Sequence, residues 1–207
     1  MTLWKKISSL RGNILYKYIL VTGKSGSGKS TISKALAKEL DYEYLDVDKV
    51  QHMIYEDTDI LNRTIEMFGS DIFDKNGNVD RKKLGKLVFS DPDKDKVQAF
   101  NDMAWVYIEK YVDNLLSSDK PYVIDWILSP ITKYWDMPAY KVYVQCDSDE
   151  DRFSRIASRD NVDIEYIKNR DKASVDFSKY TYDYVLVNKD ISSLDNYVLD
   201  IINNIKK

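Results

Sequence analysis

Residues 23–30 have the types and spacing of a loop that binds phosphate. They read Gly-Lys-Ser-Gly-Ser-Gly-Lys-Ser, which fits the pattern of glycine, any four residues and then Gly-Lys-Ser. Glycines let the backbone curl so that successive N–H groups face an anion, while the lysine reaches the outer phosphates and the serine hydroxyl binds Mg²⁺. We therefore predict an ATP and Mg²⁺ site in which Lys29 is also catalytic and Ser30 is a metal ligand. The predicted ATP contacts are Gly23, Lys24, Ser25, Gly26, Ser27, Gly28, Lys29, Ser30 and Thr31.

Carboxylates follow two of the expected strands. Asp46 and Asp48 come at the end of a strand-like segment, and Asp125 ends another one. Residues two apart in a strand point to the same side, so Asp46 and Asp48 would face the substrate together if the extended backbone continues to Asp48. One of them could accept the proton of an acceptor hydroxyl and the other could hold Mg²⁺ through water; alternatively, one caps a helix that starts near Lys49. Asp125 has the position of a carboxylate that orders Mg²⁺ in phosphate-loop enzymes, so we predict a metal ligand there.

Arginines gather late in the chain, with four of the seven between positions 152 and 170. The spacing of Arg152, Arg155 and Arg159 predicts that they share one face of a helix. The planar guanidinium group suits phosphate oxygens, and we predict that Arg155 and Arg159 contact the transferring phosphoryl group. The alternative is a solvated helix whose arginines pair with the aspartate and glutamate residues around them.

Two residue types occur once each. We expect the single histidine, His52, on a helix beside the acceptor substrate, although a lone histidine is more often structural. The single cysteine, Cys146, excludes an intramolecular disulfide, and we expect a buried structural thiol there.

The elements that must position these residues alternate between strand and helix. Strand patterns occupy 18–22, 43–46, 122–127, 140–146 and 184–187, and helical patterns occupy 29–40, 48–56, 58–69, 80–89, 93–117, 148–159, 163–172 and 191–205. Such alternation predicts an α/β fold, a three-layer α/β/α arrangement around a parallel five-stranded sheet of the P-loop NTPase type. We expect one kinase domain over 17–207, with a helical acceptor-binding insertion at about 48–117, a lid at about 152–172, and an N-terminal extension over 1–16.

Composition limits the classes of partner. The 207 residues carry a net charge of −3 and are 43% hydrophobic, which is typical of a globular protein and offers no broad positive field for nucleic acid. No apolar run approaches the ~20 residues that span a bilayer, and the apolar stretch within 1–16 is too broken for a secretory signal. We therefore expect a cytoplasmic monomer or small homo-oligomer that acts on a small molecule, without nucleic acid or membrane.

Several segments together resemble the dephospho-coenzyme A kinase family over roughly residues 18–200. They are the loop 22–30, the run Asp46-Val47-Asp48-Lys49-Val50-Gln51-His52, the pair Tyr55-Glu56, the pair Phe68-Gly69, the run Asn76-Gly77-Asn78-Val79-Asp80-Arg81 with Leu84, the run 88–92, and the run 183–188. The resemblance implies transfer of the γ-phosphoryl group of ATP to the ribose 3′-hydroxyl of dephospho-CoA, the last step of coenzyme A synthesis. It also implies that Asp48 accepts the proton, that Arg81 contacts the acceptor, and that Arg155 and Arg159 attend the phosphates.

The chain departs from the family pattern at three places. Trp105-Val106 stands where the family usually has His-Pro, 127–131 where it has Pro-Leu-Leu-Phe-Glu, and Asp151-Arg152 where it has Thr-Gln. These departures fall mainly on the acceptor side and leave two other hypotheses open. One is a kinase of the same fold with a different nucleoside or metabolite as acceptor. The other is a nucleotide-dependent binding or regulatory module without turnover.

Overall fold

The computed structural model describes residues 16–172 and 174–206, so the expected N-terminal extension lies almost wholly outside the described residues. The chain divides into two compact units. The first unit holds the residues up to 46 together with those from 119 onward, and the second unit holds residues 47–118. None of the helices in the described ranges is long and apolar enough to cross a membrane.

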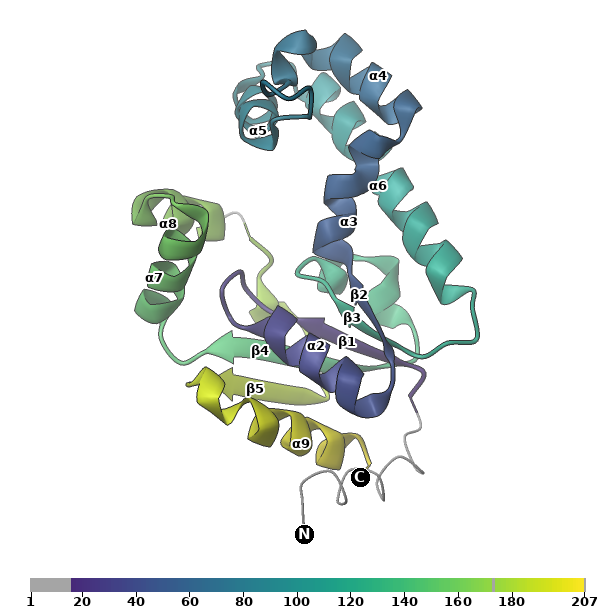
Figure 1. Ribbon diagram of the computed structural model, residues 1–207, viewed down its shortest axis with the longest axis vertical. Coiled ribbons are helices and arrows are strands. Elements are labelled where there is room, and N and C mark those ends of the chain that lie inside the picture. Colours follow the sequence, from purple (N-terminus) through teal and green to yellow (C-terminus); the bar gives the residue numbers. More distant parts are fainter. Residues whose placement is uncertain (1–15, 173, 207) are drawn as a thin grey trace. The chain divides into compact units, whose positions relative to one another are not determined.

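A parallel sheet of five strands organises the first unit (Figure 1). The strands are β1 (Tyr18–Thr22), β2 (Glu43–Asp46), β3 (Tyr122–Asp125), β4 (Ala139–Cys146) and β5 (Tyr184–Asn188), in the spatial order β2-β3-β1-β4-β5. In the register of neighbouring strands, Asp125 pairs with Val21 on one side and with Asp46 on the other. The predicted parallel five-stranded sheet is confirmed. Strands β1, β2 and β3 end together, which brings the residues that follow them to one edge.

Helices α2 (Lys29–Leu40) and α9 (Leu194–Ile205) cover one face of this sheet, side by side (Figure 1). Their apolar residues at helical spacing, such as Leu36 and Ile201, are buried against Val21, Val142 and other strand residues. Burial of these aliphatic side chains is the main favourable contribution to folding of this unit. Helix α2 therefore starts at the phosphate loop and is held by the core along its length.

The other face of strand β4 carries aromatic side chains. Tyr140 lies in the aliphatic core, and Tyr143, three residues further along the strand, points to the opposite face. The Tyr143 ring stacks on Phe177 and Tyr182 with centroid distances of 5.2 and 4.8 Å, and Trp135 meets Tyr182 edge to face. Trp135 comes from the 3₁₀ segment η5 (Lys133–Asp136) and Phe177 from η6 (Phe177–Lys179), and neither of these segments was predicted. A further 3₁₀ segment, η4 (Ser129–Ile131), precedes η5.

Two helices follow β4 at the carboxyl edge of the sheet, α7 (Asp149–Asp160) and α8 (Ile164–Lys172). They pack against each other and lie within the region expected to form a lid. Ser148 caps the start of α7 by accepting a hydrogen bond from the Asp151 N–H group, and Asn161 ends the helix in the left-handed conformation.

The second unit is helical. It contains α3 (Val47–Met53), η2 (Ile54–Glu56), α4 (Thr58–Phe68), η3 (Ser70–Ile72), α5 (Arg81–Ser90) and α6 (Lys94–Leu116). Aspartate side chains cap the start of three of these helices, namely Asp57, Asp80 and Asp93. Its small core consists of Ile72, Leu84 and Phe100 with partly buried neighbours.

Candidate active site

The phosphate loop joins β1 to α2, as the sequence predicts. Gly28 occupies the position before the first turn of α2 with φ of 91°, a backbone conformation that favours glycine. A Cβ atom at this position would lie 2.2 Å from Nδ2 of Asn188, the amide that donates a 2.8 Å hydrogen bond to the Ser27 carbonyl. Glycine is thus required both by the backbone conformation and by the close approach of β5. Sequence reasoning placed Asn188 at the end of this strand but did not assign it a contact with the loop.

Lys29 and Asp125 meet at the carboxyl edge of the sheet. Nζ of Lys29 lies 3.8 Å from Oδ1 of Asp125, whose side chain is fully buried. Burial raises the pKa of Asp125 above its ordinary value, while Lys29 and a hydrogen bond from Ser30 act in the opposite direction. Two residues from the loop and one from β3 therefore form a single polar cluster, which joins three of the predicted site residues.

The donor set of this cluster suits a Mg²⁺ ion. Oδ1 of Asp125 is buried and accepts no hydrogen bond from the described residues, and the Ser30 hydroxyl lies beside the same carboxylate. Within the described part of the chain, no group of three or more histidine, cysteine, aspartate or glutamate residues could hold a metal. Mg²⁺ commonly takes one or two carboxylates, substrate phosphates and several waters rather than a full protein cage. Ser30 and Asp125 fit that mode of binding.

Tyr44 connects the two carboxylates that end β2 and β3. Its hydroxyl lies 3.0 Å from Oδ2 of Asp125 and 3.2 Å from Oδ2 of Asp46. Burial, followed by the charges of Asp125 and Asp46, raises the pKa of Tyr44, so the phenol keeps its proton. One hydroxyl therefore orients two acidic side chains. Sequence reasoning missed this residue, although its spacing of two from Asp46 places both side chains on the same side of β2.

The structure corrects the expected geometry of Asp48. Strand β2 ends at Asp46 and α3 begins at Val47, so Asp48 lies in the first turn of a helix instead of an extended segment. The two-residue alternation of a strand consequently does not relate Asp46 to Asp48. A carboxylate in the first turn of a helix is stabilised by the positive end of the helix dipole. His52 lies further along α3, and its side chain is outside the described part of the structure.

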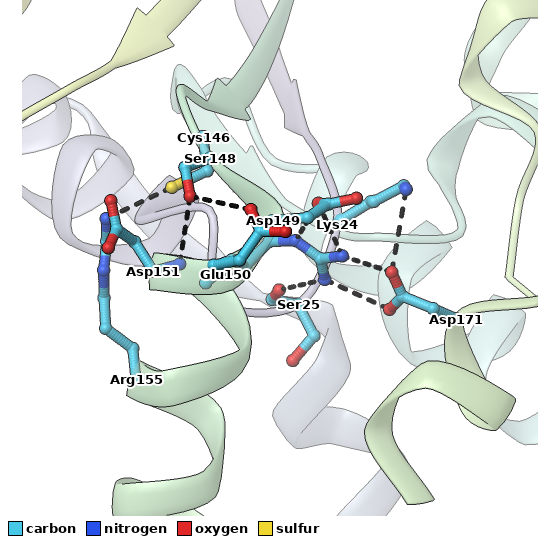
Figure 2. Close-up of polar contacts among 10 residues, drawn as sticks. Lys24, Ser25, Cys146, Ser148, Asp149, Glu150, Asp151, Arg155 and Asp171 are labelled. Carbon is cyan, nitrogen blue, oxygen red and sulfur yellow. Dashed lines mark hydrogen bonds and ion pairs between the residues drawn. The ribbon is translucent and has the colours of Figure 1, made fainter. Parts of the chain in front are cut away.

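The three arginines of α7 have separate environments. Arg152 is buried, whereas Arg155 and Arg159 are exposed. Nη2 of Arg155 lies 3.1 Å from Sγ of Cys146 (Figure 2). Nε and Nη2 of Arg159 donate hydrogen bonds to the two carboxylate oxygens of Asp160 at 2.7 and 2.8 Å. Cys146 is only partly buried, so the expectation of a buried thiol is wrong.

A groove within the second unit is a second part of the candidate site. Its volume is about 650 Å³, within the range of small-molecule sites. Arg81 and Lys94 supply positive charge, Gln51, Tyr55 and Asn101 supply hydrogen-bonding groups, and the apolar lining consists of Leu84, Val88, Val97 and Phe100. The groove thus combines cationic, amide and apolar groups along one surface.

Comparison with known proteins supports one chemistry. A family model described as dephospho-CoA kinase matches residues 17–193. The dephospho-CoA kinase of Fusobacterium nucleatum is 35% identical over 153 residues, which cover 70% of this chain and 74% of that protein.

Two solved structures share the fold. A protein from Thermus thermophilus superposes with a TM-score of 0.73 at 24% identity and covers 90% of this chain and 95% of its own. A dephospho-CoA kinase from Campylobacter jejuni superposes with a TM-score of 0.61 at 20% identity and covers 92% of this chain and 97% of its own.

Proposed function

We propose that this chain, which belongs to the dephospho-CoA kinase family, transfers the γ-phosphoryl group of ATP to the ribose 3′-hydroxyl of dephospho-CoA. The observation that supports it most directly is the cluster of Lys29, Ser30 and Asp125 where the phosphate loop meets the end of β3. Such a cluster provides what phosphoryl transfer requires from a protein, namely positioned charge and a metal ligand set.

The loop residues act on the phosphates. Lys29 neutralises the negative charge on the β- and γ-phosphates, and the backbone N–H groups of the loop and the start of α2 orient them. Ser30 and Asp125 would hold Mg²⁺, which when bound would screen the charge of the phosphate oxygens. Tyr44 keeps the Asp125 carboxylate oriented while the cluster carries this charge.

Asp48 accepts the proton of the attacking hydroxyl. It follows Asp46 by two residues, and because consecutive Cα atoms are 3.8 Å apart, the covalent chain keeps it near the end of β2. Asp46 lies beside the substrate in the same segment. A carboxylate that takes up the hydroxyl proton during transfer prevents the build-up of positive charge on the attacking oxygen.

Arg155 and Arg159 attend the transferring group. Both are exposed, so neither has to break a buried ion pair in order to reach a phosphate. Arg159 exchanges its contact with Asp160 for the ligand, and Arg155 leaves Cys146. Planar guanidinium groups can contact two phosphate oxygens at once, which suits both residues to this role.

The groove of the second unit binds the acceptor. Dephospho-CoA joins a long arm with two amide groups to a diphosphate and an adenosine. The apolar lining and the side-chain amides of the groove match the arm, while Arg81 and Lys94 match the negative diphosphate. His52, which follows Gln51 in α3, belongs to the same substrate side.

A coupled assay of ADP release tests this function. With Mg²⁺ and ATP present, we expect ADP release to depend on added dephospho-CoA and to stop when coenzyme A replaces it, because coenzyme A already carries the 3′-phosphate. Adenosine and other nucleosides serve as further acceptors. ADP release with a nucleoside but not with dephospho-CoA would contradict the acceptor and leave the phosphate-loop chemistry standing.

Replacing Arg81 with alanine separates acceptor binding from ATP binding. We expect the KM for dephospho-CoA to rise by about tenfold or more, since a charge-assisted hydrogen bond to a phosphate is lost, and the KM for ATP to stay within twofold. Steady-state kinetics with each substrate varied in turn measures both constants. Arg63→Ala is the matched control, because Arg63 is an exposed arginine on α4 that does not line the groove. Equal kinetic effects of the two substitutions would remove Arg81 from the acceptor site.

A further inference from the structure

Two backbone carbonyl groups of the phosphate loop accept hydrogen bonds from side chains elsewhere in the chain. A loop that turns its N–H groups toward an anion turns carbonyl oxygens away from it, and those oxygens need partners. Asn188 donates to the Ser27 carbonyl, and Nη1 of Arg152 donates to the Ser25 carbonyl over 3.1 Å. Side chains from β5 and α7 therefore hydrogen-bond to two peptide carbonyl groups of the loop.

Arg152 is only 1% exposed, and it forms four hydrogen bonds and an ion pair with Asp149. Nε donates to Asp149 at 2.9 Å, Nη1 contacts the Ser25 carbonyl and Oδ1 of Asp171 at 3.1 Å each, and Nη2 contacts Asp149 and Oδ2 of Asp171. Figure 2 shows Ser25, Asp149 and Asp171 close to one another. A guanidinium has five N–H groups; four of them form these hydrogen bonds, and the ion pair with Asp149 lies on the remaining side of Nη2. Arg152 is thus placed to shape the loop.

Asp171 extends this arrangement to α8. Its carboxylate binds Arg152 in two-pronged fashion and also lies 3.6 Å from Nζ of Lys24 in the loop. The preceding residue, Arg170, contacts the Ser25 hydroxyl at 3.3 Å. Asp171 is largely buried, with 13% of its side chain exposed, and it is surrounded by these cations.

The phosphate loop also packs closely against helix α7 at Gly26. A Cβ atom on Gly26 would lie 2.8 Å from the Ile156 side chain and 3.0 Å from Cγ of Arg152. The loop backbone therefore rests directly on α7, with no space for a side chain between them. Arg152 is one of the two side chains of α7 against which Gly26 packs, the other being Ile156, so a change at Arg152 alters the support of the Ser25–Gly26 peptide.

We infer that Arg152 is a positioning residue that fixes the Ser25 peptide in its phosphate-binding orientation and, through Asp171, locks helices α7 and α8 to the loop. The inference deepens the proposed function and rests on ATP binding at this loop. It predicts an effect on ATP and on phosphoryl transfer, with no effect on the acceptor.

Two variants test the role. Arg152→Lys keeps the charge but cannot form the fork, and the double substitution Arg152→Gln with Asp171→Asn removes both buried charges and shortens the side chain. We expect each to raise the Kd and the KM for Mg²⁺-ATP by about tenfold or more, while the KM for dephospho-CoA stays within twofold. Titration calorimetry gives the Kd, and circular dichroism with thermal unfolding establishes that each variant is folded.

Asp151→Asn is the control, because Asp151 is an exposed carboxylate in the same first turn of α7; we expect a change below twofold. If Arg152 only balances the charge of Asp171, the double variant should bind Mg²⁺-ATP with the same Kd as the unmodified chain. That result would overturn the inference, even if Arg152→Lys does not fold. Failure of the unmodified chain to bind Mg²⁺-ATP would instead overturn the proposed function and this inference together.

Discussion

Replacing Lys29 with alanine should lower kcat by about 10²–10³-fold, the effect typical of removing one preorganised group that stabilises transition-state charge. The side chain of Lys29 is 11% exposed, and its ammonium group lies 3.8 Å from the Asp125 carboxylate. Because it is buried beside the loop, water cannot replace its charge on the γ-phosphate. Measurement of kcat and of the KM for ATP in the ADP-release assay gives the effect, and thermal unfolding shows whether the variant remains folded.

The control for Lys29 is Lys38→Ala. Lys38 lies in the last turn of the same helix and is exposed, so we expect kcat within twofold of the unmodified chain. Loss of Lys29 also leaves Asp125 buried without that cation, which raises the pKa of this carboxyl further. A folded Lys29→Ala variant that keeps more than a tenth of the activity would remove this lysine from the catalytic step.

Replacing Asp48 with asparagine should lower kcat by about 10²–10⁴-fold while Mg²⁺-ATP still binds with an unchanged Kd. The substitution keeps the shape of the side chain and removes its capacity to take up a proton, which is the contribution expected of a general base. Since Lys29, Ser30 and Asp125 are untouched, ATP binding should not change. Single-turnover kinetics measures the chemical step, and calorimetry measures ATP binding.

Asp59→Asn is the matched control for Asp48. Both aspartates lie in the first turn of a helix of the second unit, so the two substitutions remove a similar interaction with a helix dipole. We expect Asp59→Asn to leave kcat within twofold. Near-normal turnover by Asp48→Asn would refute the proton-acceptor role and point to Asp46, the other carboxylate of that segment.

Much of the fold could be predicted because its signals are local. The predicted helix over 29–40 and the predicted strands over 18–22 and 43–46 have the observed bounds. Apolar residues recur every two positions in a strand and every three to four in a helix when one face of the element is buried, so a short stretch of sequence is enough to reveal the element. The strand expected over 122–127 instead stops at Asp125, and the N–H group of Trp126 donates to the Val21 carbonyl before the chain turns into a 3₁₀ segment.

The environments of the charged residues were not predictable in the same way. The spacing of Arg152, Arg155 and Arg159 suggested one surface, yet Arg152 is buried under the loop. Its place depends on Ser25, which is 127 positions away in the chain, and on Asp171 in the next helix. The family pattern has glutamine at this position. The reason for an arginine here is its contact with the carboxylate of Asp171, which only the tertiary structure shows.

The sequence alone determined the phosphate loop, the helix after it and the alternation that builds a parallel sheet, because glycine conformations and residue periods are properties of neighbouring residues. Tertiary structure decided which side chains meet: Tyr44 reaches Asp125 across 81 positions because β2 and β3 lie adjacent in register. It also decided that Asp48 lies in the first turn of a helix and that Arg152 lies beneath the loop. Such contacts depend on strand order and on the packing of distant elements, and no local pattern encodes either of them.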